Sequence, residues 1–158
     1  MVLAAAATPI TLPTPSASPP PAAVTADATY GTRVIALENA ARAHVGCVPL
    51  RADPAITKAA TEHARDMGTK NYLGHDSRAT AAASPWDRMK AAGYRAPAAE
   101  NIAAGYATPQ DVVSGWMDDA DHKANILNCS VKATGVGYFH ADKPGTGGPW
   151  WTQDFGYR

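Results

Sequence analysis

The sequence has few cysteines, no net charge and no long apolar run. It contains two cysteines, neither in a C-x-x-C motif, and fourteen basic residues balanced by fourteen acidic ones. A balanced chain produces no field that draws it to nucleic acid or to an anionic membrane. No stretch approaches the roughly eighteen apolar residues that a membrane span needs. The sequence therefore predicts neither a nucleic-acid partner nor a membrane span.

The chain of 158 residues is long enough for one domain with its own core. Residues 1–28 consist mainly of Ala, Pro, Thr and Ser, a composition that predicts a disordered leader or linker. Its start resembles a trimmed signal peptide, and the rest is typical of a semi-extended spacer or of a tail without a role. The folded domain is expected over residues 29–158, as a monomer.

Apolar spacing and capping residues predict the helices. Apolar residues recur every three or four positions over residues 30–45, with Arg33 and Arg42 among the polar positions. Further helices are expected after Asp53-Pro54, after Ser84-Pro85 and after Thr108-Pro109, because each pair places a capping side chain before a proline. A short helical turn is expected over residues 122–127.

The end of the chain has a different pattern. Residues 134–141 and 149–157 are rich in β-branched and aromatic side chains, and a Gly- and Pro-containing turn separates them. These segments predict a β-hairpin. Its Trp150, Trp151 and Phe155 alternate between faces, so the core and an exposed face are both open to them, and core packing is favoured over a ligand platform. Residues 98–106 form either a strand or an irregular segment. Helices packed on a small sheet make the fold class α+β.

Two interpretations fit the cysteines. Cys47 and Cys129 both lie in loops and form a disulfide in an exported protein, or they are separate buried thiols of a cytosolic protein. In the chain-entropy model, closing a loop of this length stabilises the fold by about 4–5 kcal/mol. The disulfide is the first interpretation.

A set of motifs in chain order resembles the CAP superfamily, also called the SCP domain. The resemblance covers almost everything after the leader. It is carried by Ala59 to Met67, Gly74-His75, Glu100-Asn101, Trp116-Met117, His122 to Leu127 and Trp151 to Gly156.

The resemblance implies a three-layer α-β-α sandwich with a small antiparallel sheet and a cleft of two histidines and two acids. His75 and His122 match the histidines and Glu100 the first acid. Asp119 is the candidate for the second acid, although it is one methylene shorter than the glutamate of many animal members. The two cysteines are similar to a bridge in exported actinobacterial members, which implies a secreted or cell-surface bacterial protein.

Two imidazoles and a carboxylate are able to hold Zn²⁺ or another divalent cation and to leave a position for water. His75 and His122 are the candidate metal ligands, although they lie on separate elements and lack the compact H-E-x-x-H spacing. Alternatively, Glu100 orients one imidazole without any metal. His63 is expected to be structural, and Ser77, close to His75, is a weak candidate for a nucleophile.

Three functions follow from this cleft. The first is an extracellular binding module for a lipid, a peptide or a cell-wall glycan, without catalysis. The alternative is a zinc-dependent peptidase or esterase in which Glu100 is the general base to a metal-bound water. In the third, the histidines only hold the helices together.

Overall fold

The computed structural model describes residues 26–79, 81–141 and 147–158. Over these ranges the helices are α1 (Ala26–His44), α2 (Pro54–Lys70), α3 (Pro85–Ala91), α4 (Pro109–Asp118) and α5 (Ala120–Ile126). The strands are β1 (Arg51–Ala52), β2 (Pro97–Ala104), β3 (Ala133–Phe139) and β4 (Trp150–Gly156). The predicted helices and the C-terminal hairpin are present, and the segment left open between strand and irregular structure is the strand β2.

The four strands form one sheet in the order β1-β3-β4-β2. β4 pairs antiparallel with both β3 and β2, which gives the small antiparallel sheet that was expected. β1 pairs parallel with β3, so the whole sheet is mixed, and the expectation needs correction at this edge. β1 has only two residues, both exposed, so it carries no alternation that the sequence could reveal.

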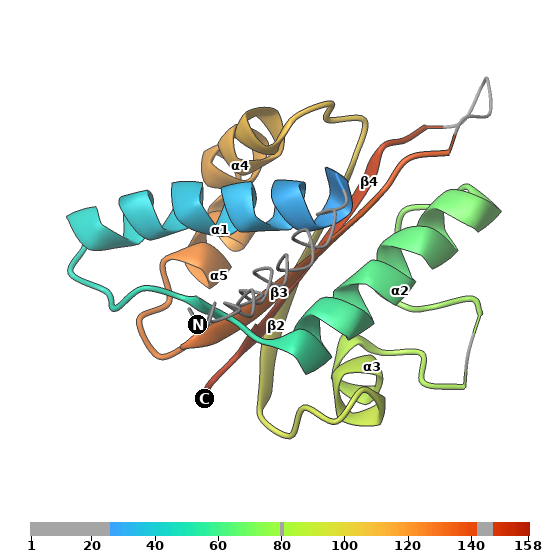
Figure 1. Cartoon of the computed structure of the whole chain (residues 1–158), viewed down its shortest axis with the longest axis horizontal. Helices are drawn as coiled ribbons and strands as arrows, with labels where there is room; N and C mark the ends of the chain where they lie inside the picture. The colour runs from blue at the N-terminus through green and yellow to red at the C-terminus, as the bar shows by residue number, and fades with distance from the viewer. Residues whose placement is uncertain (1–25, 80, 142–146) are drawn as a thin grey trace, which may run out of the picture.

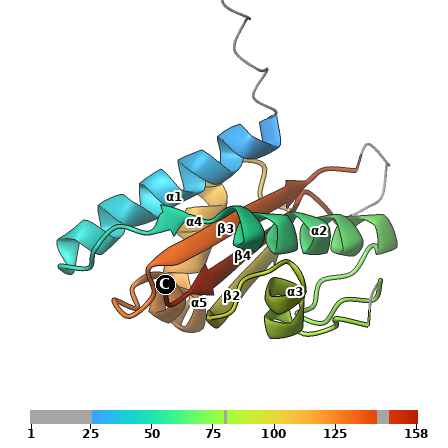
Figure 2. The ribbon, with the colours of Figure 1, turned by 60° about the horizontal axis from the view of Figure 1, so that its bottom comes forward.

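Helices cover both faces of the sheet, which confirms the three-layer sandwich (Figures 1 and 2). α2 and α3 lie on one face, and α1, α4 and α5 lie on the other. α2 lies very close to β3 because Gly135 has no side chain. A Cβ built at Gly135 would be 2.1 Å from the backbone nitrogen of Thr57.

Alternation along β4 distributes the large aromatic side chains between the two layers. Trp150 packs with Met67 and Tyr72 on one side, and Trp151 packs in the main core with Val34 on the other. Trp150, Trp151 and Phe155 have at most 1% of their surface exposed. The prediction that this cluster packs the core is confirmed.

Two expectations about α1 were wrong. The helix begins at Ala26 and so includes residues 26–28, which the composition had assigned to the leader. Alanine has the highest helix propensity, so a packed helix extends through this segment at little cost. The rest of the leader lies outside the described residues.

None of the helices over the described ranges is long and apolar enough to cross a bilayer.

Arg42, expected at a polar position of this helix, is completely buried. Its guanidinium donates to the carbonyl oxygens of Val48, Ile126, Asn128 and Val131. These bonds attach α1 to the loops on either side of the disulfide.

The two cysteines form the disulfide. Cys47 and Cys129 are 82 positions apart in sequence, and their Cα atoms are 4.9 Å apart. The bond joins the loop after α1 to the loop after α5. It therefore fixes the end of the helix that carries His122.

Candidate functional site

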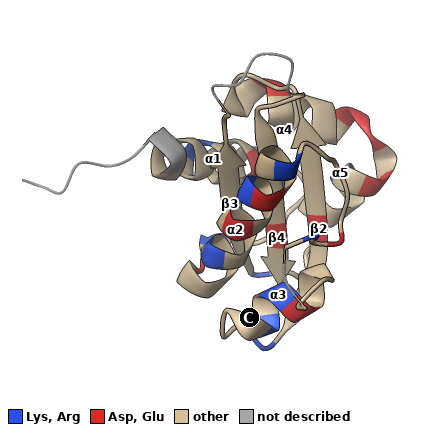
Figure 3. Cartoon of the chain, turned by 90° about the vertical axis from the view of Figure 1, so that its right-hand side faces the viewer, with Lys and Arg blue, Asp and Glu red and all other residues tan. Residues whose placement is uncertain are grey.

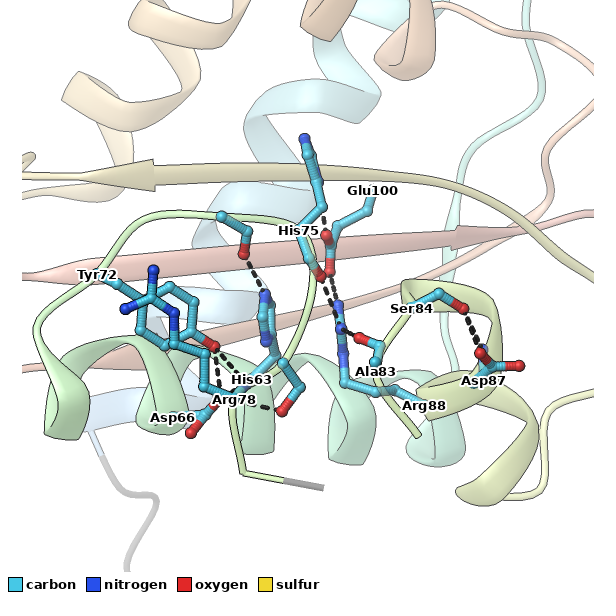
Figure 4. Close-up of polar contacts among 12 residues, drawn as sticks. His63, Asp66, Tyr72, His75, Arg78, Ala83, Ser84, Asp87, Arg88 and Glu100 are labelled. Atoms are coloured by element: carbon cyan, nitrogen blue, oxygen red, sulfur yellow. Dashed lines mark hydrogen bonds and ion pairs between the residues drawn. The ribbon is translucent and has the colours of Figure 1, made fainter. Parts of the chain in front are cut away.

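His75 and Glu100 form the centre of the candidate site (Figure 4). His75 lies in the loop between α2 and α3, and Glu100 lies in β2. The His75 Nδ1 atom is 2.7 Å from Glu100 Oε1. The His75 side chain is 55% exposed, whereas only 1% of the Glu100 side chain is exposed. The pair thus consists of a solvent-exposed imidazole that is hydrogen-bonded to a buried carboxylate.

Arg88 of α3 holds both members of this pair. Its Nη2 atom pairs with Glu100 Oε2, and its Nη1 atom donates to the His75 carbonyl oxygen over 2.7 Å. One buried guanidinium therefore fixes the carboxylate and the loop that carries the histidine. Sequence reasoning missed Arg88, because an arginine in a short helix usually lies on the solvent side.

The carboxylate determines the state of the imidazole. The hydrogen bond to Glu100 raises the pKa of His75 above its ordinary value, and burial opposes that change to a smaller extent. Since the ring donates from Nδ1 to Glu100, its Nε2 atom is the one left for a ligand. Glu100 therefore orients the imidazole of His75, the alternative to a metal-bound role.

Asp154 lies behind Glu100. The two residues are directly opposite each other in the β2–β4 ladder, and Asp154 is fully buried. Burial, followed by the charge of Glu100, raises the pKa of Asp154 well above its usual range. Asp154 was also missed, although an acid between Trp151 and Phe155 in an apolar strand is an unusual pattern that could have indicated it.

His122 is oriented by Asp119. Asp119 is the N-cap of α5 and accepts the backbone N–H groups of Asp121 and His122, each at 3.1 Å. The same oxygen is 3.0 Å from His122 Nδ1. These contacts, with the His122 backbone N–H first, lower the pKa of Asp119. Its side chain is 54% exposed, so Asp119 serves here as a cap and a partner of His122.

An asparagine pair connects β2 to α5. Asn101 donates to the His122 carbonyl oxygen over 3.3 Å and accepts from Asn125 over 2.9 Å. Successive strand residues point to opposite faces, so Glu100 points to the α3 layer and Asn101 to the α5 layer. The two predicted histidines therefore approach β2 from opposite faces of the sheet.

A groove of about 470 Å³ lies at the outer edge of β2. It is lined by His75, Asp76, Ser84, Pro85, Trp86, Ala98, Ala99, Glu100 and Asn125. Trp86 is 44% exposed and forms part of its wall. Of the four predicted cleft residues, His75 and Glu100 line this groove, whereas His122 and Asp119 do not.

The donor set does not fit a zinc site with three protein ligands. Within the described ranges, no group of three or more His, Cys, Asp and Glu side chains is arranged to hold a metal ion. Both Glu100 oxygens are already bound, one by His75 and one by Arg88. Metal binding by His75 and His122 stays a prediction.

Side chains of α2 hold the loop that carries His75 in place. His63 Nε2 is 2.9 Å from the Gly74 carbonyl oxygen, and burial lowers the pKa of His63. Ser77 donates to Asp66 over 2.9 Å, as does the backbone N–H of Arg78 over 2.8 Å. His63 has the expected structural place, and the hydroxyl of Ser77 is bound to Asp66.

The family model of the cysteine-rich secretory proteins, CAP, matches residues 35–155. This match covers well over half of the chain, so the chain belongs to that family. Figure 4 therefore shows a histidine–glutamate pair of a CAP domain.

Two curated relatives come from Bacillus subtilis (strain 168). The chain is 41% identical to the uncharacterized protein YkwD over 128 residues, which are 80% of this chain and 46% of YkwD. It is 29% identical to the uncharacterized membrane protein YlbC over 106 residues, which are 66% of this chain and 30% of YlbC. The chain spans less than half the length of these relatives.

Solved structures have the same fold. An extracellular protein of Bacillus anthracis str. Ames that contains an SCP domain has a TM-score of 0.73 and 26% identity, over 84% of this chain and 41% of that chain. An outer surface protein of Borrelia burgdorferi has a TM-score of 0.69 and 19% identity, over 80% of this chain and 91% of that chain.

Proposed function

We propose that this chain is an extracellular binding module whose groove at β2 accepts a lipid, a peptide or a cell-wall glycan. The observation that carries the proposal is the contrast within the His75–Glu100 pair. The imidazole is open to the groove, while its carboxylate partner is buried and bound by Arg88. Such a preorganised polar group beside the exposed Trp86 is typical of a ligand site.

The burial of Glu100 favours binding over hydrolysis. A general base must come within hydrogen-bond distance of the water or hydroxyl that it deprotonates. The Glu100 carboxylate is almost completely covered, and both of its oxygens already accept from neighbouring groups. A groove water would have to displace His75 or Arg88 to reach it. The zinc-dependent hydrolase therefore has less support.

Two observations support an extracellular location. The first is the Cys47–Cys129 disulfide. Disulfides persist in oxidising compartments and are uncommon in the cytosol. One structural relative is described as an extracellular protein with an SCP domain. Secretion is part of the proposal, as is any activity of a longer protein that includes this domain.

The experiment compares two single variants of matched exposure. Trp86→Ala alters the groove wall, and Tyr157→Ala alters a side chain of similar exposure that does not line the groove. Isotope-labelled protein is titrated with chitin oligosaccharides, anionic phospholipid vesicles and short peptides, and amide NMR shifts are followed. We expect one class of ligand to shift the amide resonances of residues around His75. That ligand should bind to Trp86→Ala about tenfold more weakly than to wild type, whereas its affinity for Tyr157→Ala should not change.

Two results would count against the proposal. The first is that no class of ligand perturbs the groove. The second is chelator-sensitive hydrolysis of a peptide or ester panel by zinc-loaded protein that is lost in Glu100→Gln, because that result would establish the hydrolase instead.

A further inference from the structure

The groove lies on the open edge of the sheet. β2 is the last strand in the order β1-β3-β4-β2, so one of its two edges has no neighbouring strand among the described residues (Figure 3). The N–H and C=O groups on such an edge are free to pair with another extended chain. Which residues of β2 point to this edge follows from the hydrogen bonds of Ile102, Gly105 and the neighbouring strand β4.

The hydrogen-bond pattern places the main chain of Glu100 on the open edge. The Ile102 carbonyl accepts from Trp116 Nε1 of α4 over 3.2 Å, so Ile102 points away from β4. Gly105, three residues later, donates to the Pro149 carbonyl over 2.8 Å and points toward the β4 side. In an antiparallel ladder, the backbone N–H and C=O groups of successive residues point alternately toward and away from the neighbouring strand. Those of Glu100 therefore point the same way as those of Ile102, away from β4.

The pattern on the other strand agrees. The Gly156 carbonyl accepts from the backbone N–H of Lys132 over 2.8 Å, so Gly156 points toward β3. Asp154, two residues earlier, has the same direction. The Glu100–Asp154 pair is therefore a pair without mutual backbone hydrogen bonds. This leaves the N–H and C=O of Glu100 directed outward.

Exposure shows that this main chain reaches the groove. Glu100 as a residue is 6% exposed, but its side chain is only 1% exposed. The part of Glu100 that lines the groove is therefore mainly its backbone. Over the described ranges, no backbone–backbone hydrogen bond outside the sheet ladder ends on the N–H or C=O of Glu100.

The groove walls leave this edge accessible. His75 and Trp86 form the wall on the α3 side, and Asn125 of α5 stands on the other side of the sheet. Between them, β2 contributes the small side chains of Ala98 and Ala99. The groove thus straddles the edge of the sheet.

The charge of the rim indicates what would bind. Asp76 lines the groove, and Asp87 accepts from the lining residue Ser84 over 2.6 Å. No lysine or arginine is among the described residues that line the groove. A basic side chain would meet these acids and the face of Trp86.

We propose that the groove binds an extended, basic peptide segment, which adds to β2 as a further strand by pairing with the N–H and C=O of Glu100. This inference rests on the proposed function and selects the peptide from its three ligand classes. Main-chain pairing of this kind is a general mode of peptide recognition. A glycan would use Trp86 and the polar side chains but would not need an open backbone pair at Glu100.

The test uses a defined probe, the capped pentapeptide acetyl-Val-Lys-Val-Lys-Val-amide, with the full chain. We expect saturable binding with a Kd of about 1 mM or lower. Binding shifts the Glu100 amide resonance downfield and slows its hydrogen exchange. The same peptide N-methylated on alternate residues that face the edge binds at least about tenfold more weakly, because its lost main-chain hydrogen bonds leave groups of the edge unpaired. The acidic analogue with Glu in place of Lys also binds more weakly.

Matched variants separate the groove from the rest of the surface. Trp86→Ala weakens binding of the pentapeptide, whereas Tyr157→Ala, which alters an exposed side chain that does not line the groove, does not. Equal affinity of the N-methylated peptide, or no slowing of exchange at Glu100, overturns the proposal. If chitin oligosaccharides shift the groove resonances and the peptide does not, the peptide inference fails and the binding module stands. If no oligosaccharide, phospholipid vesicle or peptide shifts the groove resonances, both fail.

Discussion

Glu100 and Asp154 lie directly opposite each other in β2 and β4, both buried, and the charge of one guanidinium, that of Arg88, acts on both. Two carboxylates close together in a buried site do not both ionise readily. Glu100 is bound by Arg88 and His75, whereas burial and the charge of Glu100 raise the pKa of Asp154. The exposed imidazole therefore lies above two buried acids, and the pKa of the deeper one, Asp154, is raised by burial and by the charge of Glu100.

Replacing Asp154 by asparagine should raise stability more at high pH than at low pH. The folded-state pKa of Asp154 is raised, so its contribution is full below the unfolded pKa and is lost as the pH rises toward the folded pKa. The asparagine side chain is neutral throughout and would not show this loss. Between the unfolded and the folded pKa of Asp154, we expect the stability of Asp154→Asn relative to wild type to increase by up to about 1.4 kcal/mol per pH unit.

Urea unfolding between pH 4 and about pH 8 measures this difference. Asp118→Asn, a change at an exposed acid of α4, provides the control and should leave the slope of stability against pH unchanged. Parallel curves for Asp154→Asn and wild type would contradict a proton on Asp154.

The pKa of His75 should fall when Glu100 loses its charge. The hydrogen bond from His75 to Glu100 is the main cause of the raised pKa. This interaction therefore stabilises the fold most when His75 is protonated, and it weakens as the pH rises through the His75 pKa. In Glu100→Gln, an NMR titration of the His75 ring should show a lower midpoint.

The control for the titration is Glu62→Gln, which neutralises an acid on the outer side of α2. It should leave the midpoint of His75 where it is in wild type. If Glu100→Gln does not move the midpoint, His75 is not oriented through Nδ1 by this carboxylate.

Arg88 should be the most costly single residue of the site to remove. Arg88→Met leaves a buried carboxylate without its cation, a change that costs about 3–5 kcal/mol in comparable buried pairs. Arg88→Lys keeps the charge but loses the planar fork, so we expect a smaller loss. Thermal or urea unfolding at neutral pH compares both with Arg95→Met, which removes an exposed arginine near the same helix. Equal stability of Arg88→Met and Arg95→Met would contradict the role of Arg88.

The elements of the fold could be predicted because their signals are local. Asp53-Pro54 begins α2 as the sequence indicated, and the Asp53 side chain accepts the N–H groups of Ala55 and Ile56. The alternation of β4 likewise predicted a core strand. β1 escaped prediction because a strand of two exposed residues is defined only by its pairing with β3.

The site was predicted only in part, since its buried partners depend on tertiary contacts. Motif resemblance indicated His75 and Glu100, but their geometry depends on Arg88 and Asp154, which come from other elements of the fold. Arg42 shows the same limit. Its place in the helical pattern favoured solvent, whereas carbonyl oxygens from distant loops satisfy its guanidinium in the interior.

Breaking the disulfide should loosen α5 more than α3. Cys47 and Cys129 close a loop that spans 82 positions, which corresponds to about 4.5 kcal/mol in the chain-entropy model. The double variant Cys47→Ser with Cys129→Ser should lose stability of this order, as should wild type treated with a reductant.

Because Cys129 follows α5 closely, amide hydrogen exchange should rise first around His122 and Asn125. The His75 loop is held separately by Arg88 and His63, so its exchange should change less. Uniform acceleration in both segments would mean that the two sides of the groove are not anchored independently.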